Sequence, residues 1–178
     1  ALATWPKAEF FQAYGLTETA GAVCINLPVN HRAQGDARAL LNSVGHAGLG
    51  AEIQVVDELG QEAPRGQVGE IWVRGPMIMQ GYWKQPDATA AAFVDGWFRT
   101  GDLGRMREDG YLFIVDRLKD MIITGGENVY CAEVEAVLRN HADVAQAAVI
   151  GVPDVKWGEA VHAVIVLTST ASLSADEM

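Results

Sequence analysis

Short stretches in which apolar and polar residues partly alternate occupy the first two thirds of the chain. Such alternation at residues 52–56 and 70–74, between connections rich in Asp and Gly, is typical of half-buried strands in an antiparallel sheet. Residues 97–106 and 111–115 flank an Asp-Gly pair, which is a strong turn signal, so a β-hairpin is predicted there. An alanine-rich run after a capping Asp predicts one short helix over residues 87–93. This part of the chain is therefore predicted to be mostly β-structure.

The pattern changes after the hairpin. A short strand is predicted over residues 121–124, followed by a Gly-Gly pair and then by a helix. One face of this helix carries Val134, Val137 and Leu138. Two further strands are predicted at about residues 144–152 and 160–166, which completes a β-α-β-β unit. The predicted fold class is α+β, with a domain boundary that divides the chain into residues 1–117, mostly β, and residues 118–178.

The two ends of the chain favour a piece of a longer protein. There is no initiator Met, and the first residues have neither the basic nor the apolar region of a targeting segment. Ser174 and Glu177 have the spacing of a capping box, so the chain stops where a helix is expected to begin. A length of 178 residues suits one domain or one domain plus part of another. We expect a C-terminal fragment whose last domain is incomplete; a free C-terminal tail is the alternative.

Composition and charge narrow the possible partners. The chain has 13 basic and 23 acidic residues, a net charge of −10, so the broad basic face of a nucleic-acid-binding protein is not expected. It is 49% hydrophobic, yet no apolar stretch approaches the roughly 18 residues of a transmembrane segment. Cys24 and Cys131 lie far apart and are expected to be buried, unpaired thiols, which favours a reducing, cytoplasmic location. The sequence does not indicate an oligomeric state.

The segment Tyr14-Gly15-Leu16-Thr17-Glu18-Thr19 gathers several groups that suit a nucleotide. An aromatic face can stack on a base, and a glycine lets a phosphate approach the backbone closely. Two hydroxyls can donate hydrogen bonds, and a carboxylate is a hard oxygen ligand for Mg²⁺. An ordinary polar loop is the alternative for this segment taken alone.

A second candidate is the carboxylate of Asp102, which lies between two glycines after an aromatic strand. A carboxylate in this setting can accept hydrogen bonds from both hydroxyls of a ribose, because it has two acceptor oxygens and the flanking glycines leave room for the sugar. The alternative is an Asp that caps a turn. Arg117, at the far end of the hairpin that begins near Asp102, strengthens the first interpretation.

These segments and four others occur in an order that resembles the acyl-CoA synthetases of the adenylate-forming enzyme superfamily. The segments that carry the resemblance are Tyr14-Gly-Leu-Thr-Glu18, Gly69-Glu-Ile-Trp-Val-Arg-Gly75 with Gly81-Tyr-Trp83, Gly96-Trp-Phe-Arg-Thr-Gly-Asp102, Gly110-Tyr-Leu-Phe-Ile-Val-Asp-Arg-Leu-Lys-Asp120, Gly125-Gly-Glu-Asn-Val129 with Glu133-Val-Glu135, and Gly151-Val-Pro-Asp154 with Gly158-Glu159. The resemblance spans about residues 10–167. Six segments in one order are more specific than any single motif.

The resemblance implies a reaction in two steps and a division into two domains. A small-molecule carboxylic acid, fatty or aryl, attacks the α-phosphate of Mg²⁺-bound ATP to give an acyl-adenylate and pyrophosphate; the thiol of coenzyme A then displaces AMP. Residues 1–117 correspond to the mostly-β end of the large AMP-binding domain, and residues 118–178 to a truncated, mobile C-terminal domain. The acyl chain length is not indicated.

The resemblance also implies roles for particular residues. Tyr14 would stack on adenine, Gly15 and Thr17 would meet the phosphate, and Glu18 would hold Mg²⁺. Asp102 would bind the ribose hydroxyls.

Four further positions, at the domain boundary and beyond it, receive roles from the same resemblance. Arg117 would support the ribose, and Lys119 matches the hinge about which the small domain swings between the two steps. Gly125 and Gly126 would line the passage for the pantetheine arm of coenzyme A, since they lack Cβ atoms. A simple strand-to-helix turn is the alternative interpretation of the glycine pair; the two can hold together, and we favour both together.

Two departures from the family pattern limit what this chain can do alone. The family's phosphate-binding loop and its adenylating lysine are both outside this sequence, so the 178-residue chain is expected to be inactive. Alternatives are the adenylation domain of a peptide synthetase, a luciferase-type enzyme, or a separate non-catalytic binding module. Residues 121–129 lack the basic, Arg-containing loop usual in peptide synthetases, which disfavours the first two of these.

Overall fold

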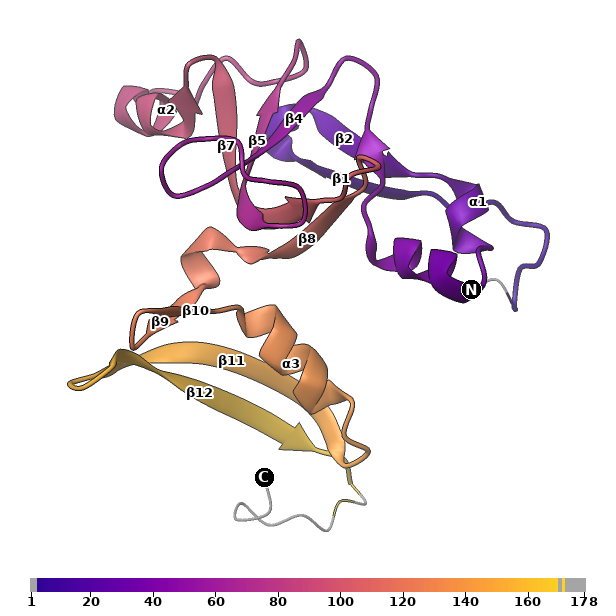
Figure 1. The fold of residues 1–178 in the computed structure, drawn as a ribbon, viewed down its shortest axis with the longest axis vertical. Coiled ribbons are helices and arrows are strands. Elements are labelled where there is room, and N and C mark those ends of the chain that lie inside the picture. The colour runs from indigo at the N-terminus through magenta and orange to yellow at the C-terminus, as the bar shows by residue number, and fades with distance from the viewer. Residues whose placement is uncertain (1–2, 170, 172–178) are drawn as a thin grey trace. The chain divides into compact units, whose positions relative to one another are not determined.

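A computed structural model describes residues 3–169 and 171, and the chain forms two compact units, Ala1–Ile114 and Val115–Met178. Each unit is described by itself. The expected capping box at Ser174 and Glu177 lies outside the described residues. The mixed α and β, strand-rich fold that the sequence predicts is confirmed (Figure 1).

Unit 1 contains a small antiparallel sheet that carries the Tyr14 segment. Its strands, in spatial order, are β1 (Gln12–Leu16), β2 (Gly21–Asn26) and β3 (His46–Ala47). A single 3-10 turn, Thr17–Thr19, joins β1 to β2. Opposite Tyr14 in the sheet is Cys24, and a register shift follows immediately between Tyr14 and Gly15. Two short helical segments follow this hairpin: α1 (Pro28–His31) and a 3-10 helix, Gly35–Asn42.

The second sheet of unit 1 carries Asp102. Its strands are β4 (Glu52–Val56), β5 (Val68–Arg74), β6 (Phe93–Val94), β7 (Trp97–Met106) and β8 (Leu112–Arg117), in the order β4-β5-β7-β6 with β8 paired to β7. Helix α2 (Pro86–Ala92) precedes β6. The predicted strands, the β7–β8 hairpin and the short helix are thereby confirmed. Alternation and turn residues are local signals, which is why the sequence carries them.

One hydrophobic core joins the two sheets of unit 1. It consists of Val23, Cys24, Val44, Val55, Ala63, Ile71, Val73 and Leu112. Beside it lies a buried polar network that the hydrophobic pattern does not reveal. The amide of Asn26, which is 0% exposed, donates from Nδ2 to the carbonyls of Leu40 (2.8 Å) and Ser43 (3.0 Å), and its Oδ1 accepts from Asn30 Nδ2 at 2.7 Å. These bonds fix the 3-10 helix against β2.

Unit 2 is a four-stranded sheet with one helix. The strands are β9 (Ile122–Thr124), β10 (Glu127–Val129), β11 (Val144–Asp154) and β12 (Gly158–Leu167), in the order β10-β9-β12-β11. Helix α3 (Cys131–Arg139) lies along β11 (Figure 1). The buried residues of this core are Ile122, Cys131 and Val149, and Val129, Val134 and Leu138 pack against them.

Two sequence predictions about unit 2 are wrong in detail. Val137 was assigned to the buried face of the helix, but it is 71% exposed, and Cys131 takes the buried position instead. Cys131, Val134 and Leu138 are spaced at i, i+3 and i+7, the helical stripe that the sheet covers. The second difference is β10, which was not expected.

Strand β10 exists because Gly125 and Gly126 form a two-residue hairpin turn. Their φ angles are +60° and +88°. Positive φ at both central positions is the requirement of a type I′ turn, for which a Gly-Gly pair is a recognised signal. The glycine pair therefore reverses the chain into a second strand before the helix begins.

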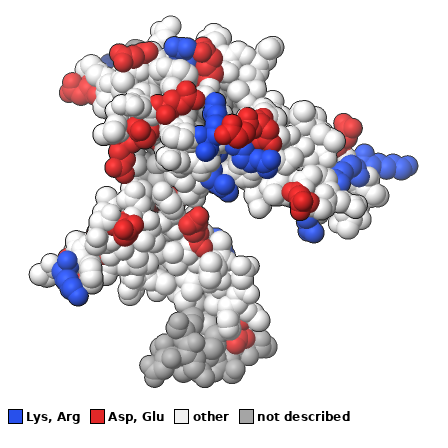
Figure 2. Space-filling model, viewed as in Figure 1, with Lys and Arg blue, Asp and Glu red and all other residues white. Residues whose placement is uncertain are grey.

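Both cysteines are buried and form no disulfide, as expected. Burial raises the pKa of the Cys24 thiol to about 12, so it is a neutral apolar group of the core. Over the described residues, no helix combines the length and the apolar character needed to cross a membrane. On the face shown in Figure 2, basic side chains are interspersed with acidic ones rather than forming a continuous basic surface.

Candidate functional site

The structure brings together two predicted site residues that are 88 positions apart in the sequence. Tyr14, on β1, donates a hydrogen bond from its hydroxyl to Oδ2 of Asp102, on β7, at 2.7 Å. Burial, and then the hydrogen bond to Asp102, raise the pKa of Tyr14 well above its ordinary value. The phenol therefore stays protonated and donates to the carboxylate. An aromatic ring and a carboxylate are thus fixed side by side in unit 1.

Asp102 lies on a β-bulge. Glu70 of β5 pairs with Leu103 of β7, and Trp72 pairs with Arg99. Three residues of β7, at positions 100–102, therefore stand opposite the single residue 71 of β5. A bulge bends a strand and redirects a side chain, and bulges are frequent beside functional sites.

The bulge is held by hydrogen bonds that replace the regular ladder. Thr100 donates from Oγ1 to the carbonyl of Ile71 at 2.7 Å and accepts from the amide of Asp102 at 3.1 Å. Gly101 has a φ of +71° and donates its amide to Oε1 of Glu70 at 3.2 Å. The direction of the Asp102 side chain therefore depends on the conformation of this short segment.

Glu18 lies on the 3-10 turn between β1 and β2. Its Oε1 accepts a hydrogen bond from the hydroxyl of Tyr82 at 2.9 Å, and its carbonyl accepts one from the amide of Met79 at 2.8 Å. Partial burial and the neighbouring Glu18 carboxylate raise the pKa of Tyr82. The segment that contains Tyr82 thus fixes both the backbone and the side chain of Glu18.

Position 15 requires a glycine for a steric reason. A Cβ atom at Gly15 would collide with the backbone of Gly21 and Ala22 on the paired strand. Thr17 is exposed at the start of the 3-10 turn, whereas Thr19 is buried. Thr19 Oγ1 accepts from the amide of Leu16 at 2.9 Å and lies 2.7 Å from the carbonyl of Gly21. The exposed Thr17 hydroxyl is available to a ligand, while Thr19 maintains the turn.

The remaining predicted residues lie in unit 2. Arg117 ends β8, and Lys119 lies on the following 3-10 turn, Leu118–Asp120, with 72% of its side chain exposed. Lys119 Nζ makes a loose contact of 3.8 Å with Asp120. A hinge assignment for Lys119 stays a prediction, because the arrangement of the two units is not described.

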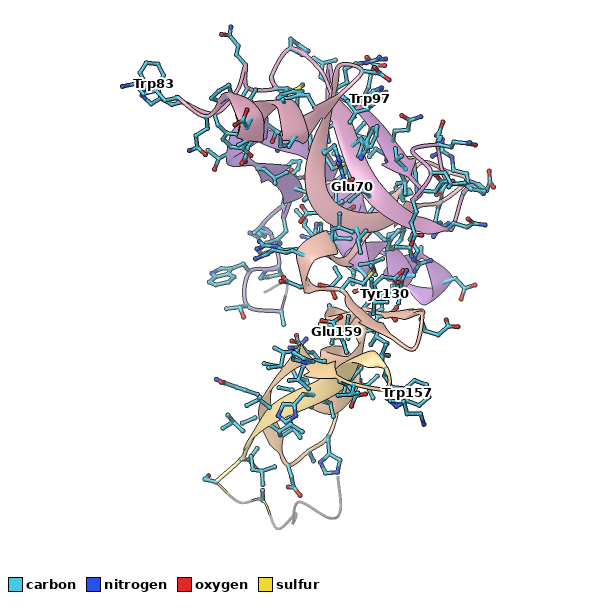
Figure 3. The ribbon with its side chains drawn as sticks, turned by 90° about the vertical axis from the view of Figure 1, so that its left-hand side faces the viewer. Glu70, Trp83, Trp97, Tyr130, Trp157 and Glu159 are labelled. Carbon is cyan, nitrogen blue, oxygen red and sulfur yellow. The ribbon has the colours of Figure 1, made fainter. Side chains whose placement is uncertain are left out.

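Lys119 also borders a groove of about 540 Å³ in unit 2. Three carboxylates on its wall each accept a backbone amide: Asp116 from Ala132 at 3.0 Å, Glu135 from Val149 at 3.0 Å, and Glu159, labelled in Figure 3, from Ile123 at 2.8 Å. These side chains stabilise the helix start and the sheet edge. We assign the groove no chemistry.

The two glycines of the predicted coenzyme A passage differ in their surroundings. A Cβ atom at Gly125 would lie 2.9 Å from the indole ring of Trp157, whereas one at Gly126 would meet no atom within 4 Å. Gly125 also donates its amide to the carbonyl of Trp157 at 2.9 Å. The turn is therefore required for the hairpin, and its role in a passage stays a prediction.

Sequence reasoning gave no role to three residues that touch the site: Glu70, Tyr82 and Thr100. All three lie in segments that carry the family resemblance, so the sequence pointed to these segments without assigning a contact to any of the three residues. Which atoms they contact depends on strand register and on the bulge.

Two protein-family models match the chain. The model of the AMP-binding enzyme covers residues 1–83, and that of the AMP-binding enzyme C-terminal domain covers residues 133–178.

Curated relatives and solved structures agree with these matches. The fatty acid–[acyl-carrier-protein] ligase ScoC of Streptomyces coeruleorubidus is 50% identical over 159 residues, 89% of this chain and 30% of that protein. The medium/long-chain-fatty-acid–CoA ligase FadD8 of Mycobacterium tuberculosis is 48% identical over 164 residues, 92% of this chain and 28% of that protein. The structure of ATP-bound MatB from Rhodopseudomonas palustris matches with a TM-score of 0.83 and 41% identity, covering 94% of this chain and 32% of that one. The chain thus spans less than a third of the length of these proteins.

Proposed function

Because the chain belongs to the family of AMP-binding, adenylate-forming enzymes, we propose that the complete protein is an ATP-dependent acyl-CoA synthetase. Its substrates would be a small-molecule carboxylic acid, fatty or aryl, together with ATP and coenzyme A. The observation that carries the proposal is the hydrogen-bonded pair of Tyr14 and Asp102 on its bulge. An aromatic face beside a carboxylate provides for both the base and the ribose of an adenine nucleotide.

The proposed reaction explains why a nucleotide site is needed. A carboxylate oxygen attacks the α-phosphorus of ATP, and the bond to the leaving pyrophosphate breaks. The thiol sulfur of coenzyme A, after losing its proton, then attacks the acyl carbon, and AMP leaves. The protein contributes mainly orientation and charge stabilisation in both steps.

Within unit 1 the residues divide by the part of ATP that they serve. The Tyr14 ring stacks on adenine, and Asp102 accepts the ribose hydroxyls. One lone pair of Oδ2 already takes the Tyr14 hydroxyl, but a carboxylate has about four acceptor positions, so it can hold the sugar as well. Gly15 and Thr17 lie where the backbone turns from β1 toward β2, and we assign them to the phosphates.

The Glu18 carboxylate fits Mg²⁺ in the way this ion usually binds. Over the described residues, no three His, Cys, Asp or Glu side chains form a metal-binding group. Mg²⁺ is commonly held by one or two carboxylates plus substrate phosphates and water, so one fixed carboxylate suffices. Tyr82 occupies Oε1 of Glu18, which fixes the direction of the carboxylate. When bound, the ion would neutralise phosphate charge. We expect Glu18→Gln to slow pyrophosphate release more than thioester formation from supplied acyl-adenylate.

For unit 2 we propose the two roles that the resemblance implies, together with support of the ribose by Arg117. Gly125 and Gly126 line the passage for coenzyme A, and Lys119 is the hinge. Lys119→Pro fixes φ near −65° and restricts the preceding residue, so one orientation of the unit is favoured. We expect this variant to retain single-turnover pyrophosphate release but to lose thioester formation, whereas Lys119→Ala, which keeps backbone freedom, retains both. Proportional losses in the two steps would contradict the hinge.

A second acceptor needs a direct test, because the relative ScoC is a fatty acid–[acyl-carrier-protein] ligase. Both acceptors present a thiol on a pantetheine arm, so the adenylation step is common to them. The proposal favours free coenzyme A. Transfer to a carrier protein without transfer to coenzyme A would replace it.

The test of the proposed function is a screen of the complete reading frame that contains this sequence. Pyrophosphate release is measured with ATP and short, long or aromatic acids, followed by detection of the thioester with coenzyme A or a carrier protein. We expect acid-dependent release with at least one class and none from the 178-residue chain alone. A complete protein that activates no acid would contradict the proposal. A cytoplasmic location is part of the proposal, and two unpaired thiols fit a reducing compartment.

A further inference from the structure

Glu70 is an enclosed carboxylate next to the proposed nucleotide site. It lies on β5 beside the bulge of β7 (Figure 3). Its side chain is 11% exposed. Oε2 accepts hydrogen bonds from Trp72 Nε1 and Arg99 Nε, both at 2.9 Å, and lies 2.8 Å from Arg99 Nη2. Oε1 accepts the amide of Gly101 at 3.2 Å. One carboxylate therefore links two neighbouring side chains to the backbone of the bulge.

We propose that Glu70 is a positioning residue that determines how Asp102 presents its carboxylate to the ribose of the nucleotide. The inference rests on the proposed function, since it requires Asp102 to bind the sugar. Glu70 itself need not touch the ligand. It acts through Gly101, which immediately precedes Asp102.

The bulge explains why a side chain is needed at this place. Three residues of β7, at positions 100–102, stand opposite one residue of β5. Gly101 therefore has no residue of β5 paired with it in the ladder. A backbone amide without an acceptor in a partly buried place is unfavourable, because it loses its hydrogen bond to water and gains none in return. Glu70 Oε1 supplies that acceptor, and it does so only when the bulge has the conformation seen here.

Arg99 offsets the unfavourable burial of the Glu70 carboxylate and fixes the orientation of its two oxygens. Its Nε and Nη2 both contact Oε2, which leaves Oε1 for Gly101. The guanidinium carbon of Arg99 also lies 5.9 Å from the centroid of the Trp72 ring, so the cation is held from a second side. A neutral amide in place of Glu70 would turn its NH₂ group toward either Gly101 or these donors. Glu70→Gln therefore loosens the bulge while it preserves side-chain volume.

A ligand that lacks the ribose hydroxyls separates this role from a general structural one. If Glu70 acts through Asp102, its replacement lowers affinity for AMP but leaves affinity for 2′,3′-dideoxy-AMP nearly unchanged. A general loosening of the fold lowers both affinities by the same factor. The decisive quantity is the ratio of the two dissociation constants, measured by calorimetry on the complete protein.

We expect Glu70→Gln to reduce the preference for AMP over the dideoxy analogue about tenfold, the effect of one good hydrogen bond to a charged group. Asp102→Ala gives the preference that remains without the proposed ribose contact. A matched control is Glu52→Gln, because Glu52 lies on β4 of the same sheet and pairs with Arg74, at 2.6 and 3.1 Å, rather than with the bulge. Its nucleotide preference is expected to equal that of the unmodified protein.

A second variant keeps the test decisive if Glu70→Gln does not fold. Thr100→Val removes the Oγ1 that accepts the Asp102 amide and donates to Ile71, with little change in shape. It is expected to lower the same preference. Thermal unfolding of each variant shows whether folding is retained.

The outcomes separate the inference from the proposed function. A protein that activates no acid, yet whose preference for AMP over its dideoxy analogue falls in Glu70→Gln, contradicts the proposed function and supports the inference. A protein that activates an acid while Glu70→Gln and Thr100→Val keep the full preference overturns the inference alone. Equal loss of affinity for both ligands also overturns it, and no preference in the unmodified protein contradicts both.

Discussion

Replacing Gly101 by Ala separates the backbone conformation of the bulge from steric effects. Gly101 has a φ of +71°, and a Cβ atom there would meet no atom within 4 Å. The substitution therefore introduces no collision. Its only penalty is the left-handed backbone conformation, which is unfavourable for an L-residue by about 1–2 kcal/mol.

The protein can respond to this strain in two ways. In each, the strain energy sets an upper limit on the loss, either of stability or of AMP affinity. If the bulge stays as it is, the free energy of unfolding falls by the full amount, about 1–2 kcal/mol, and nucleotide binding is unaffected. If the bulge rotates to relieve the strain, Asp102 turns away, and a nucleotide must restore its direction on binding. The affinity then falls by no more than the strain energy, a factor of about 5–30. We expect the second response, because the bulge is held by hydrogen bonds to the side chains of Glu70 and Thr100 rather than by the regular ladder, so it rotates more readily than a paired strand.

Gly96→Ala is the matched control for Gly101→Ala. Gly96 has a φ of +82° and, like Gly101, no atom within 4 Å of an added Cβ. It lies in the turn between β6 and β7, away from Asp102 in the chain. The two variants carry similar backbone strain, but only one of them involves the site.

The assay measures AMP affinity by calorimetry and unfolding by urea for both variants in the complete protein. We expect Gly101→Ala to bind AMP 5–30-fold more weakly, by the relation of free energy to affinity, and Gly96→Ala to bind it normally while losing about 1–2 kcal/mol of stability. Equal affinity losses in the two variants would refute the assignment of Asp102. A loss beyond about 30-fold in Gly101→Ala would refute the limit set by strain.

Three further predictions concern stability. Asn26→Ala removes three hydrogen bonds, two of them buried, and is expected to lower the free energy of unfolding by about 3 kcal/mol. Gln54→Ala, whose amide makes one 3.4 Å contact, is expected to lose under about 0.5 kcal/mol; similar losses for the two variants in urea unfolding would contradict the network. The raised pKa of Tyr14 means that the unfolded chain loses this proton first, so stability falls as the pH rises above about 10, by up to about 1.4 kcal/mol per pH unit. Tyr14→Phe should show a shallower decline between about pH 9 and pH 11, and identical slopes would contradict the shift. Gly125→Ala is expected to accelerate amide exchange in β9 and β10 more than Gly126→Ala, because only its Cβ meets an indole ring, at 2.9 Å; the reverse order would contradict the hairpin geometry.

Local features of this protein were determined by the sequence itself. The strand predicted at residues 52–56 coincides with β4, and the Asp-Gly turn correctly separates β7 from β8. Alternation, turn residues and capping residues act over a few positions, so they can be interpreted without the rest of the fold. The Gly-Gly turn of β10 was equally available from the sequence. It was missed because a second interpretation, a strand-to-helix turn, explained the same pair.

The tertiary structure alone decided which distant residues meet. Tyr14 and Asp102 are joined only because the two sheets of unit 1 share a core, and Glu70 reaches Gly101 only because β7 has extra residues opposite β5. A shift of one residue in strand register turns every side chain to the opposite face. Such register depends on packing between segments far apart in sequence, and no local pattern records it. The motifs therefore identified the family and its candidate residues, whereas the bulge and its hydrogen bonds determined how those residues are held.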